Sequence, residues 1–386
     1  MKIKTLNVYP IKALRPIPLT SATLTPQGIL HDRTYMLFRV NEDSSLRKLQ
    51  LSSCPQTALF SQEIVSSFDN ITTSSDGDDG DTILVRYNIP SPPLIPHHPL
   101  QDTTLRVPLV PDDALTAALE PISIDLHGSP AEALRMGDPY DAFFSACLGF
   151  PTILVHIGSG RRPVLGTLAP GSSSSASSSQ SLFSSIASYL PSLTSSQPKP
   201  EADQWLTFTD CAPYLVTSHS SLSHPSLAPF TPSSPSTPSP IMPKFRPNIV
   251  LEDPSENPFA EDFWAELTLH PSARKLLLTA NCGRCSSLNV DYATGRPAPG
   301  PEGKLLNTLM KERRVDPGHK YAPIFGRYAF LSGSGAGDRD ETIRVRVGDE
   351  VTVSRRNAER TVFDWPLGGA STSSTAAAAK KAVAVA

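Results

Sequence analysis

Asn281-Cys282-Gly283-Arg284-Cys285 is the most informative stretch of this 386-residue sequence. Two cysteines at this spacing can be half of a zinc site, a thioredoxin-like redox motif, or two thiols packed in a turn. One of them can also be a single soft ligand for a metal whose other ligands come from a cofactor. The chemistry of the chain depends on which of these explanations applies.

The surroundings of the pair weaken two of the explanations. A zinc site needs a second Cys or His pair, but Cys54, Cys147 and Cys211 are scattered far upstream. We interpret these three as buried, inert thiols of a reducing compartment. A redox motif precedes a helix, whereas residues 286–291 have the pattern of an extended segment. A lone metal ligand is favoured, with Arg284 expected to lower a thiol pKa, and two packed thiols stay open as the alternative.

Three basic residues lie next to expected strands. Arg246 precedes a proline at the start of a strand expected over residues 245–250, and Lys12 and Arg33 each lie at a strand end. A guanidinium group binds phosphate and planar heterocycles through its forked donors. Each of the three can equally be a solvated surface charge, and Arg33 can form an ion pair with Asp32.

The composition argues against several classes of function. The net charge is −3, the pI is near 6.3 and no basic stripe is present, so we expect no nucleic-acid partner. No apolar run is long enough for a transmembrane helix. The first residues resemble neither a signal peptide nor a transit peptide. We therefore expect an intracellular, cytoplasmic protein, with mitochondrial association as the alternative.

Short alternating apolar segments, separated by Pro and Gly, predict a mostly-β protein of the α+β class. Helical spacing occurs in residues 139–149, which end at Gly149, and in residues 259–267. Residues 276–353 are expected to be mostly strands. Serine- and proline-rich segments lower the apolar content to 39% and predict loops or disorder in the inserts and the tail.

In chain order these motifs resemble the MOSC-domain proteins related to the amidoxime-reducing enzymes and to the C-terminal domain of molybdenum cofactor sulfurase. The segments that carry the resemblance are Tyr9-Pro10-Ile11-Lys12, His31-Asp32-Arg33, residues 208–218, Phe245-Arg246-Pro247-Asn248, Cys282-Gly283-Arg284-Cys285, Val290-Asp291 and Val347-Gly348-Asp349. The Phe-Arg-Pro-Asn motif and the cysteine pair followed by Val-Asp are the specific ones.

The resemblance implies two closely packed β-barrel domains. The predicted divisions are a MOSC N-terminal barrel-like domain over 1–156 with acidic and Pro-rich inserts at 70–103, a low-complexity insert over 157–200, a MOSC domain over 201–365 with a Ser/Pro insert at 223–243, and a disordered tail over 366–386.

The resemblance also implies a molybdenum–molybdopterin cofactor, with Cys285 as both the metal ligand and the catalytic residue. Cys282 has no assigned role, and Trp264 is expected in the core. The residues expected to bind the pterin and its phosphate are Lys12, Arg33, Asp210, Thr217, Ser218, Arg246 and Asn248.

The implied activity is the reduction of small N-hydroxylated substrates such as amidoximes. We expect an external electron donor, a b-type cytochrome with its flavin reductase, because the tail lacks cysteines for an iron–sulfur domain. Pyridoxal phosphate is not expected, since no segment has the length of its domain. Two alternatives stay open: a module that carries the cofactor or carries sulfur on Cys285, and a relative that has lost the metal.

Overall fold

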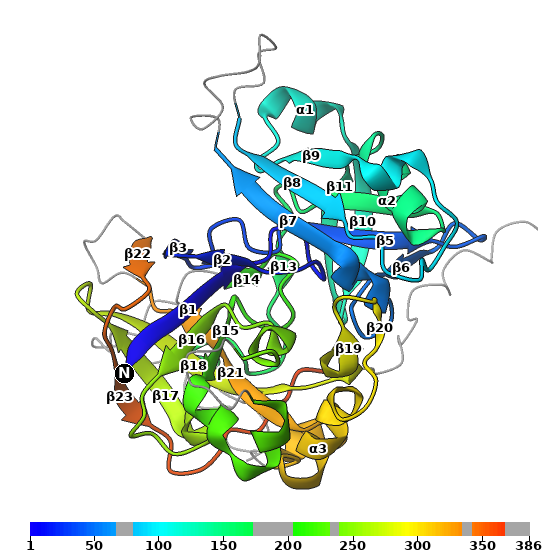
Figure 1. The fold of residues 1–386 in the computed structure, drawn as a ribbon. Helices are drawn as coiled ribbons and strands as arrows, with labels where there is room; N and C mark the ends of the chain where they lie inside the picture. Colours follow the sequence, from blue (N-terminus) through cyan, green and yellow to red (C-terminus); the bar gives the residue numbers. More distant parts are fainter. Residues whose placement is uncertain (67–79, 173–203, 232–238, 334–341, 367–386) are drawn as a thin grey trace, which may run out of the picture.

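The computed structural model describes residues 1–66, 80–172, 204–231, 239–333 and 342–366. Within these residues the chain is mostly β-strand with a few short helices, which confirms the predicted class. Figure 1 shows two lobes: an upper one from the blue-to-green part of the chain, and a lower one dominated by its C-terminal half.

The lower lobe is built on an eight-stranded sheet that contains strands from both ends of the chain. β1 (Lys2–Val8) pairs antiparallel with β16 (Ile249–Glu252), which pairs in parallel with β15 (Tyr214–Ser218). The first strand therefore joins the sheet of the predicted C-terminal domain. The order across the sheet is β2 (Ile17–Leu19), β1, β16, β15, β21 (Ile324–Leu331), β18 (Arg274–Gly283), β17 (Trp264–Leu269) and β23 (Val351–Arg356).

The upper lobe packs a five-stranded sheet, a three-stranded sheet and two helices around its own apolar core. Phe60, Phe143 and Phe144 contact one another in this core at ring-centroid distances of 5.4–6.3 Å. The two sheets are β10 (Glu120–Leu126), β11 (Ser129–Arg135), β12 (Thr152–His156), β5 (Tyr35–Val40) and β6 (Leu46–Lys48), and β7 (Phe60–Val65), β8 (Thr82–Tyr87) and β9 (Thr104–Pro108).

Short elements connect the sheets. The remaining strands are β3 (Ser21–Thr25), β4 (Gly28–Ile29) and β22 (Ile343–Arg346), which form one sheet, and the pairs β13 (Arg162–Pro163) with β14 (Trp205–Leu206) and β19 (Val290–Asp291) with β20 (Arg296–Pro297). The 3-10 helices are η1 (Pro55–Leu59), η3 (Pro99–Asp102), η4 (His219–Ser223), η5 (Pro225–Phe230), η6 (Met242–Phe245), η7 (Ala260–Phe263), η8 (Ser286–Asn289), η9 (Glu302–Lys304) and η10 (Pro317–His319).

One predicted helix is confirmed and another is wrong. α2 (Tyr140–Leu148) ends at Gly149, whose φ of 78° is the left-handed conformation that glycine adopts easily. Residues 259–267 do not form the expected α-helix. They form the short 3-10 helix η7 and then the strand β17. β17 pairs with β18 on one side and β23 on the other, so sheet pairing overrides the local helical spacing.

The other two α-helices of the described chain lie in segments where the sequence predicted no helix. α1 (Asp113–Ala118) is short, and α3 (Leu305–Glu312) lies within the region expected to be mostly strands. The strand expected from residue 245 begins later, at Ile249. η6 ends at Phe245, and the backbone of Arg246 then adopts the left-handed conformation, which does not fit a strand.

Parts of the predicted inserts pack onto the core. In the 157–200 segment, residues 157–172 are described; Arg162 is fully buried and Leu168 is 2% exposed against Trp365 and its neighbours. In the 223–243 segment, Leu227 and Ile241 are fully buried. The remainder of these segments, much of the acidic stretch and the tail from residue 367 lie outside the described residues.

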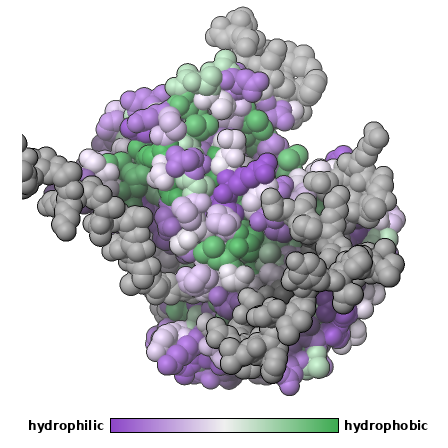
Figure 2. All heavy atoms as spheres, turned by 180° about the vertical axis from the view of Figure 1, so that it is seen from behind, coloured by the Kyte–Doolittle hydropathy of each residue, from purple (hydrophilic) through white to green (hydrophobic). Residues whose placement is uncertain are grey.

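Trp264 is fully buried in the core of the lower lobe, as expected. No helix among the described residues is long and apolar enough to cross a membrane. On the face shown in Figure 2, hydrophobic areas in green lie between hydrophilic side chains in purple.

We predict that Leu168→Ala lowers the free energy of unfolding by about 2–4 kcal/mol, because it leaves a cavity in the core. The control is Leu30→Ala, at a leucine that is 47% exposed, which should change it by less than about 0.5 kcal/mol. Urea unfolding of both variants measures the difference. Equal, small losses would show that residues 157–172 do not pack against this core.

Candidate functional site

A pocket of about 120 Å³ is lined by residues from both ends of the chain. One ordered water needs only about 10–15 Å³, so the pocket admits a larger polar ligand. Four lining side chains are cationic and one is a carboxylate, and we call it the cationic pocket. The predicted site residues in its lining are Lys12, Arg33, Asp210, Arg246, Asn248 and Cys285.

Lys12 reaches the pocket from the turn after β1. Its Nζ donates to the carbonyl of Phe208 at 2.7 Å and to Oδ1 of Asp210 at 2.5 Å. Burial lowers the pKa of Lys12 to about 8, although Asp210 favours its charged form. Burial raises the pKa of Asp210, but Lys12 and His127 outweigh it and hold that pKa well below its usual range. The Asp210 side chain is half-exposed and can accept further hydrogen bonds.

Arg33 is held by a fully buried carboxylate. Its Nη1 donates to Oδ2 of Asp32 and, at 3.2 Å, to Oδ1 of Asn248. The other oxygen of Asp32 accepts the backbone N–H of Tyr9 at 2.8 Å. The ion pair with Asp32 considered from the sequence is therefore present, and it fixes Arg33 at the pocket wall instead of leaving it at the surface.

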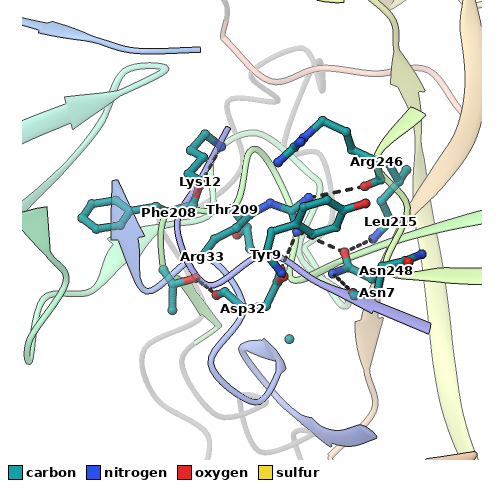
Figure 3. A network of polar contacts seen from close by, with 12 residues as sticks. Asn7, Tyr9, Lys12, Asp32, Arg33, Phe208, Thr209, Leu215, Arg246 and Asn248 are labelled. Atoms are coloured by element: carbon teal, nitrogen blue, oxygen red, sulfur yellow. Dashed lines mark hydrogen bonds and ion pairs between the residues drawn. The ribbon is translucent and has the colours of Figure 1, made fainter. Parts of the chain in front are cut away.

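Arg246 lies between η6 and β16. Its Nη1 donates to the carbonyl of Leu14 at 2.8 Å, and its guanidinium carbon lies 4.3 Å from the ring centroid of Tyr9. Arg33 approaches the same ring at 4.6 Å, so the two cations converge on one aromatic side chain (Figure 3). Nη2 of Arg246 is buried and has no hydrogen-bond partner within the described residues.

Three pocket residues other than glycine have left-handed backbones: Ala13 (φ 73°), Arg33 (φ 51°) and Arg246 (φ 56°). This conformation costs about 1–3 kcal/mol per residue. Only eight such residues occur among the described ones, so backbone strain is concentrated at this site. Strain of this kind is typical of binding and catalytic sites.

The side chain of Asn248 forms hydrogen bonds to three other parts of the protein. Its Oδ1 accepts the N–H of Leu215 at 3.1 Å as well as Arg33, and its Nδ2 donates to the carbonyl of Asn7 at 3.4 Å. These bonds join β1, β15 and β16 beside the pocket. Asn248 therefore positions Arg33, in addition to lining the pocket.

Thr217 and Ser218 do not line the cationic pocket. Both are buried near the end of β15, and the hydroxyl of Thr217 points to the sulfur of Met242 at 3.5 Å. Their assignment as polar contacts of the cofactor stays a prediction, and neither residue lines this pocket.

The two cysteines differ in environment. Cys285 is exposed and its sulfur lies 3.2 Å from Oγ of Ser287, whereas Cys282 is buried. Nη1 of Arg284 donates to the sulfur of Cys282 at 2.8 Å. Burial raises the pKa of the Cys282 thiol, and Arg284 lowers it, as expected, without outweighing burial.

The redox-motif and zinc alternatives for the cysteine pair find no support in this geometry. Cys285 precedes the 3-10 helix η8, and β18 pairs antiparallel with its neighbours, unlike the βαβ context of a redox motif. Among the described residues, no three His, Cys, Asp or Glu side chains are arranged to hold a metal ion. A metal bound to Cys285 would therefore take its other ligands from groups other than these side chains, such as a cofactor.

Sequence reasoning missed several contributors. Arg162 is fully buried and donates only to backbone carbonyls, including those of Thr207 and Thr209 at 2.8 and 2.6 Å. It adds positive charge behind the pocket. Oγ1 of Thr209 and Nε of Arg284 are buried without a partner within the described residues. No spacing signal marks Arg162, because its role arises from carbonyl groups that folding brings together.

The residues present fit an anionic ligand with polar edges. Orphaned donors on Arg246 and Arg284 and the excess of cations call for acceptor oxygens, because an unpaired buried polar group costs about 1–3 kcal/mol. The exposed thiol of Cys285 adds a soft metal ligand at the same pocket. The fold and the site thus define a two-lobed β protein with a cation-lined pocket and one accessible thiol.

The family is shown by sequence comparison. The MOSC N-terminal beta barrel domain matches residues 1–151 and the MOSC domain matches residues 203–352. The chain belongs to the MOSC domain-containing proteins, which confirms the resemblance.

Curated relatives match a smaller part of the chain. It is 33% identical to the molybdenum cofactor sulfurase of Aspergillus clavatus over 125 residues, which is 30% of this chain and 14% of that protein. It is 29% identical to the molybdenum cofactor sulfurase of Aspergillus niger over 116 residues, 28% of this chain and 13% of that protein. The matched region thus spans only a small fraction of these relatives.

We predict that Asp32→Asn destabilises the fold by about 3–5 kcal/mol, because the buried Arg33 loses its counter-charge. Glu42→Gln, at an exposed carboxylate, is the matched control and should stay within about 0.5 kcal/mol of the unmodified chain. Both are measured by urea unfolding. Equal stability of the two variants would mean that the Asp32–Arg33 pair does not anchor the pocket.

Proposed function

We propose that the chain binds a molybdenum–pterin cofactor in the cationic pocket, with Cys285 as its metal ligand, and reduces N-hydroxylated substrates of the amidoxime type. The observation that carries the proposal is the meeting of an exposed thiol with cations and orphaned donors in one pocket. A soft thiolate suits molybdenum, and guanidinium groups suit a phosphate.

Each residue has a role in this proposal. Arg246 and Lys12 bind the phosphate, and Arg33 adds charge from the position fixed by Asp32. Asp210 accepts hydrogen bonds from the amino groups of the pterin through its exposed carboxylate. When bound, the cofactor supplies the two-electron redox chemistry that reduction of an N–O bond requires. The protein contributes binding, orientation and a ligand at the metal.

The proposal includes an external electron donor, a b-type cytochrome with a flavin reductase or a similar pair. Reduction of the substrate consumes two electrons, which the chain must receive from a partner. The substrate is a small molecule that reaches the exposed side of the pocket, where Cys285 lies.

A second candidate is a module that carries the cofactor, or sulfur on Cys285, without reductase activity of its own. The observation that favours it is the name of the matched relatives, which are molybdenum cofactor sulfurases. An exposed cysteine is accessible to a sulfur donor, as this role requires.

We predict that Cys285→Ser removes bound molybdenum and abolishes benzamidoxime reduction, because the variant loses the thiolate ligand and a serine hydroxyl is far harder to deprotonate than a thiol. Cys282→Ser, at the buried cysteine two residues before Arg284, should keep most of the metal and is the matched control. The protein is prepared in a host that makes the cofactor, and metal content is measured by elemental analysis. Reduction is assayed with a chemical or protein electron donor.

The outcomes separate the candidates. Equal metal loss in both cysteine variants would point to a two-cysteine site. Full metal content with no benzamidoxime reduction by the unmodified protein would favour the carrier module over the reductase. Protein from the cofactor-making host that contains no molybdenum would contradict the reductase and the cofactor carrier, and would leave the sulfur carrier.

We predict that Arg246→Ala weakens cofactor retention by about ten- to a hundred-fold, the value of a charge-assisted hydrogen bond of roughly 1.5–3 kcal/mol. Lys12→Ala should act less strongly, because an ammonium group lacks the bidentate fork. Arg355→Ala, at an exposed arginine outside the pocket, is the control. Pterin and molybdenum are measured after gel filtration, with folding checked by circular dichroism. Full occupancy in folded Arg246→Ala would remove Arg246 from the site.

A further inference from the structure

A second cavity in the lower lobe is lined by three arginines. Its volume is about 470 Å³, and it shares no lining residue with the cationic pocket. We call it the arginine cavity. No aspartate or glutamate lines it, and its cationic lining consists of Arg313 at the end of α3, Arg356 at the end of β23 and Arg360 in the segment that follows.

A buried carboxylate behind the cavity orients two of the arginines. Nη2 of Arg313 donates to both oxygens of Asp262 at 2.7 and 2.9 Å, and Nε of Arg360 donates to one of them at 2.7 Å. Asp262 is completely buried, so it cannot rotate out to solvent. One carboxylate therefore serves two guanidinium groups, which leaves positive charge on the cavity side.

Aromatic rings hold the same two arginines in place. The guanidinium carbon of Arg313 lies 3.8 Å from the ring centroid of Phe259, and that of Arg360 lies 4.8 Å from the ring centroid of Phe263. Within the part of the chain that the structure describes, the two Nη groups of Arg360 have no hydrogen-bond partner. Donors that are already oriented lose little side-chain entropy when they bind a ligand.

Arg356 brings the third guanidinium group to the cavity. It pairs with Glu256, which does not line the cavity, and its side chain is 43% exposed. The Arg360 side chain is 34% exposed, so both are accessible from solvent. Asp262 and Glu256 are the carboxylates that pair with these three guanidinium groups among the described residues, and both lie outside the cavity lining.

We infer that the arginine cavity is a second binding site, which takes a phosphate group, either free or as a small phosphate monoester. Guanidinium forks bind phosphate oxygens in pairs, and arginines from three different elements suit a tetrahedral anion with several acceptor oxygens. A phosphate carries about −1.5 to −2 charges at pH 7, and no carboxylate among the described lining residues repels it. Phe259, Phe263 and His224 form a partly aromatic wall for an attached organic group.

The observations favour a small ligand over a nucleic acid. The chain has a net charge of −3, and these arginines gather in one cavity instead of forming a basic stripe along the surface. The site needs neither molybdenum nor Cys285, so it is independent of the proposed function.

The test is calorimetric titration of the full chain with inorganic phosphate and, separately, with adenosine 5′-monophosphate. Arg356→Gln and Arg360→Gln should each weaken binding by about tenfold or more, because each removes a charged donor. Arg355→Gln is the matched control: it changes the neighbouring arginine of β23, which is exposed and does not line the cavity. Its affinity should equal that of the unmodified chain.

Each outcome decides the inference. Similar affinities for the two ligands would support a site for phosphate alone, and tighter binding of the nucleotide would support a site that also holds the organic group. Absence of binding of either ligand up to about 10 mM would overturn the inference. So would binding that is lost in Arg246→Ala and kept in Arg356→Gln, because it would place the phosphate in the cationic pocket. Should Arg360→Gln fail to fold after losing its bond to Asp262, Arg356→Gln decides.

Discussion

The buried carboxylate of Asp32 is the interaction on which the cationic pocket depends. It accepts the N–H of Tyr9 and pairs with Arg33, and its own backbone carbonyl accepts a hydrogen bond from Thr207 at 3.2 Å. These bonds join the end of β1, the start of β5 and the segment before β15. A buried charge is costly unless it is paired and hydrogen-bonded, so this arrangement gives Asp32 the partners that its burial requires. The pocket lies at their junction.

Much of the fold could be predicted from local pattern. The helix ending at Gly149 carries both its apolar spacing and its stop signal, and both are local properties. The failure at residues 259–267 has the opposite origin. Their spacing resembles a helix, but β17 pairs with β18, which follows it after a short turn, and with β23, which comes from a distant part of the sequence. Likewise, no local signal indicates that β1 joins the sheet of the C-terminal half.

The sequence could predict those residues of the site that belong to recognisable motifs. Lys12, Arg33, Arg246 and Cys285 stand in recognisable segments, and the structure brings them to one pocket. Their geometry could not be predicted, because the left-handed backbone of Arg246 and its contact with Tyr9 depend on tertiary packing. Thr217 and Ser218 belong to a motif of the same kind, yet they lie further along β15 than Tyr214 and Leu215, the residues of this strand that line the pocket.

Asp32 and Asp262 play the same structural role: each is a buried carboxylate that orients arginine side chains. Each is almost fully excluded from solvent and binds arginines through its oxygens, and each orients guanidinium groups toward a cavity. A carboxylate at the cavity surface would neutralise the cation in front of the ligand. Placed behind the arginine, it fixes the side chain while the remaining donors stay available. Burial of the carboxylate thus fixes guanidinium groups whose remaining donors face a cavity, and the chain does so in the two separate places where we propose anion binding.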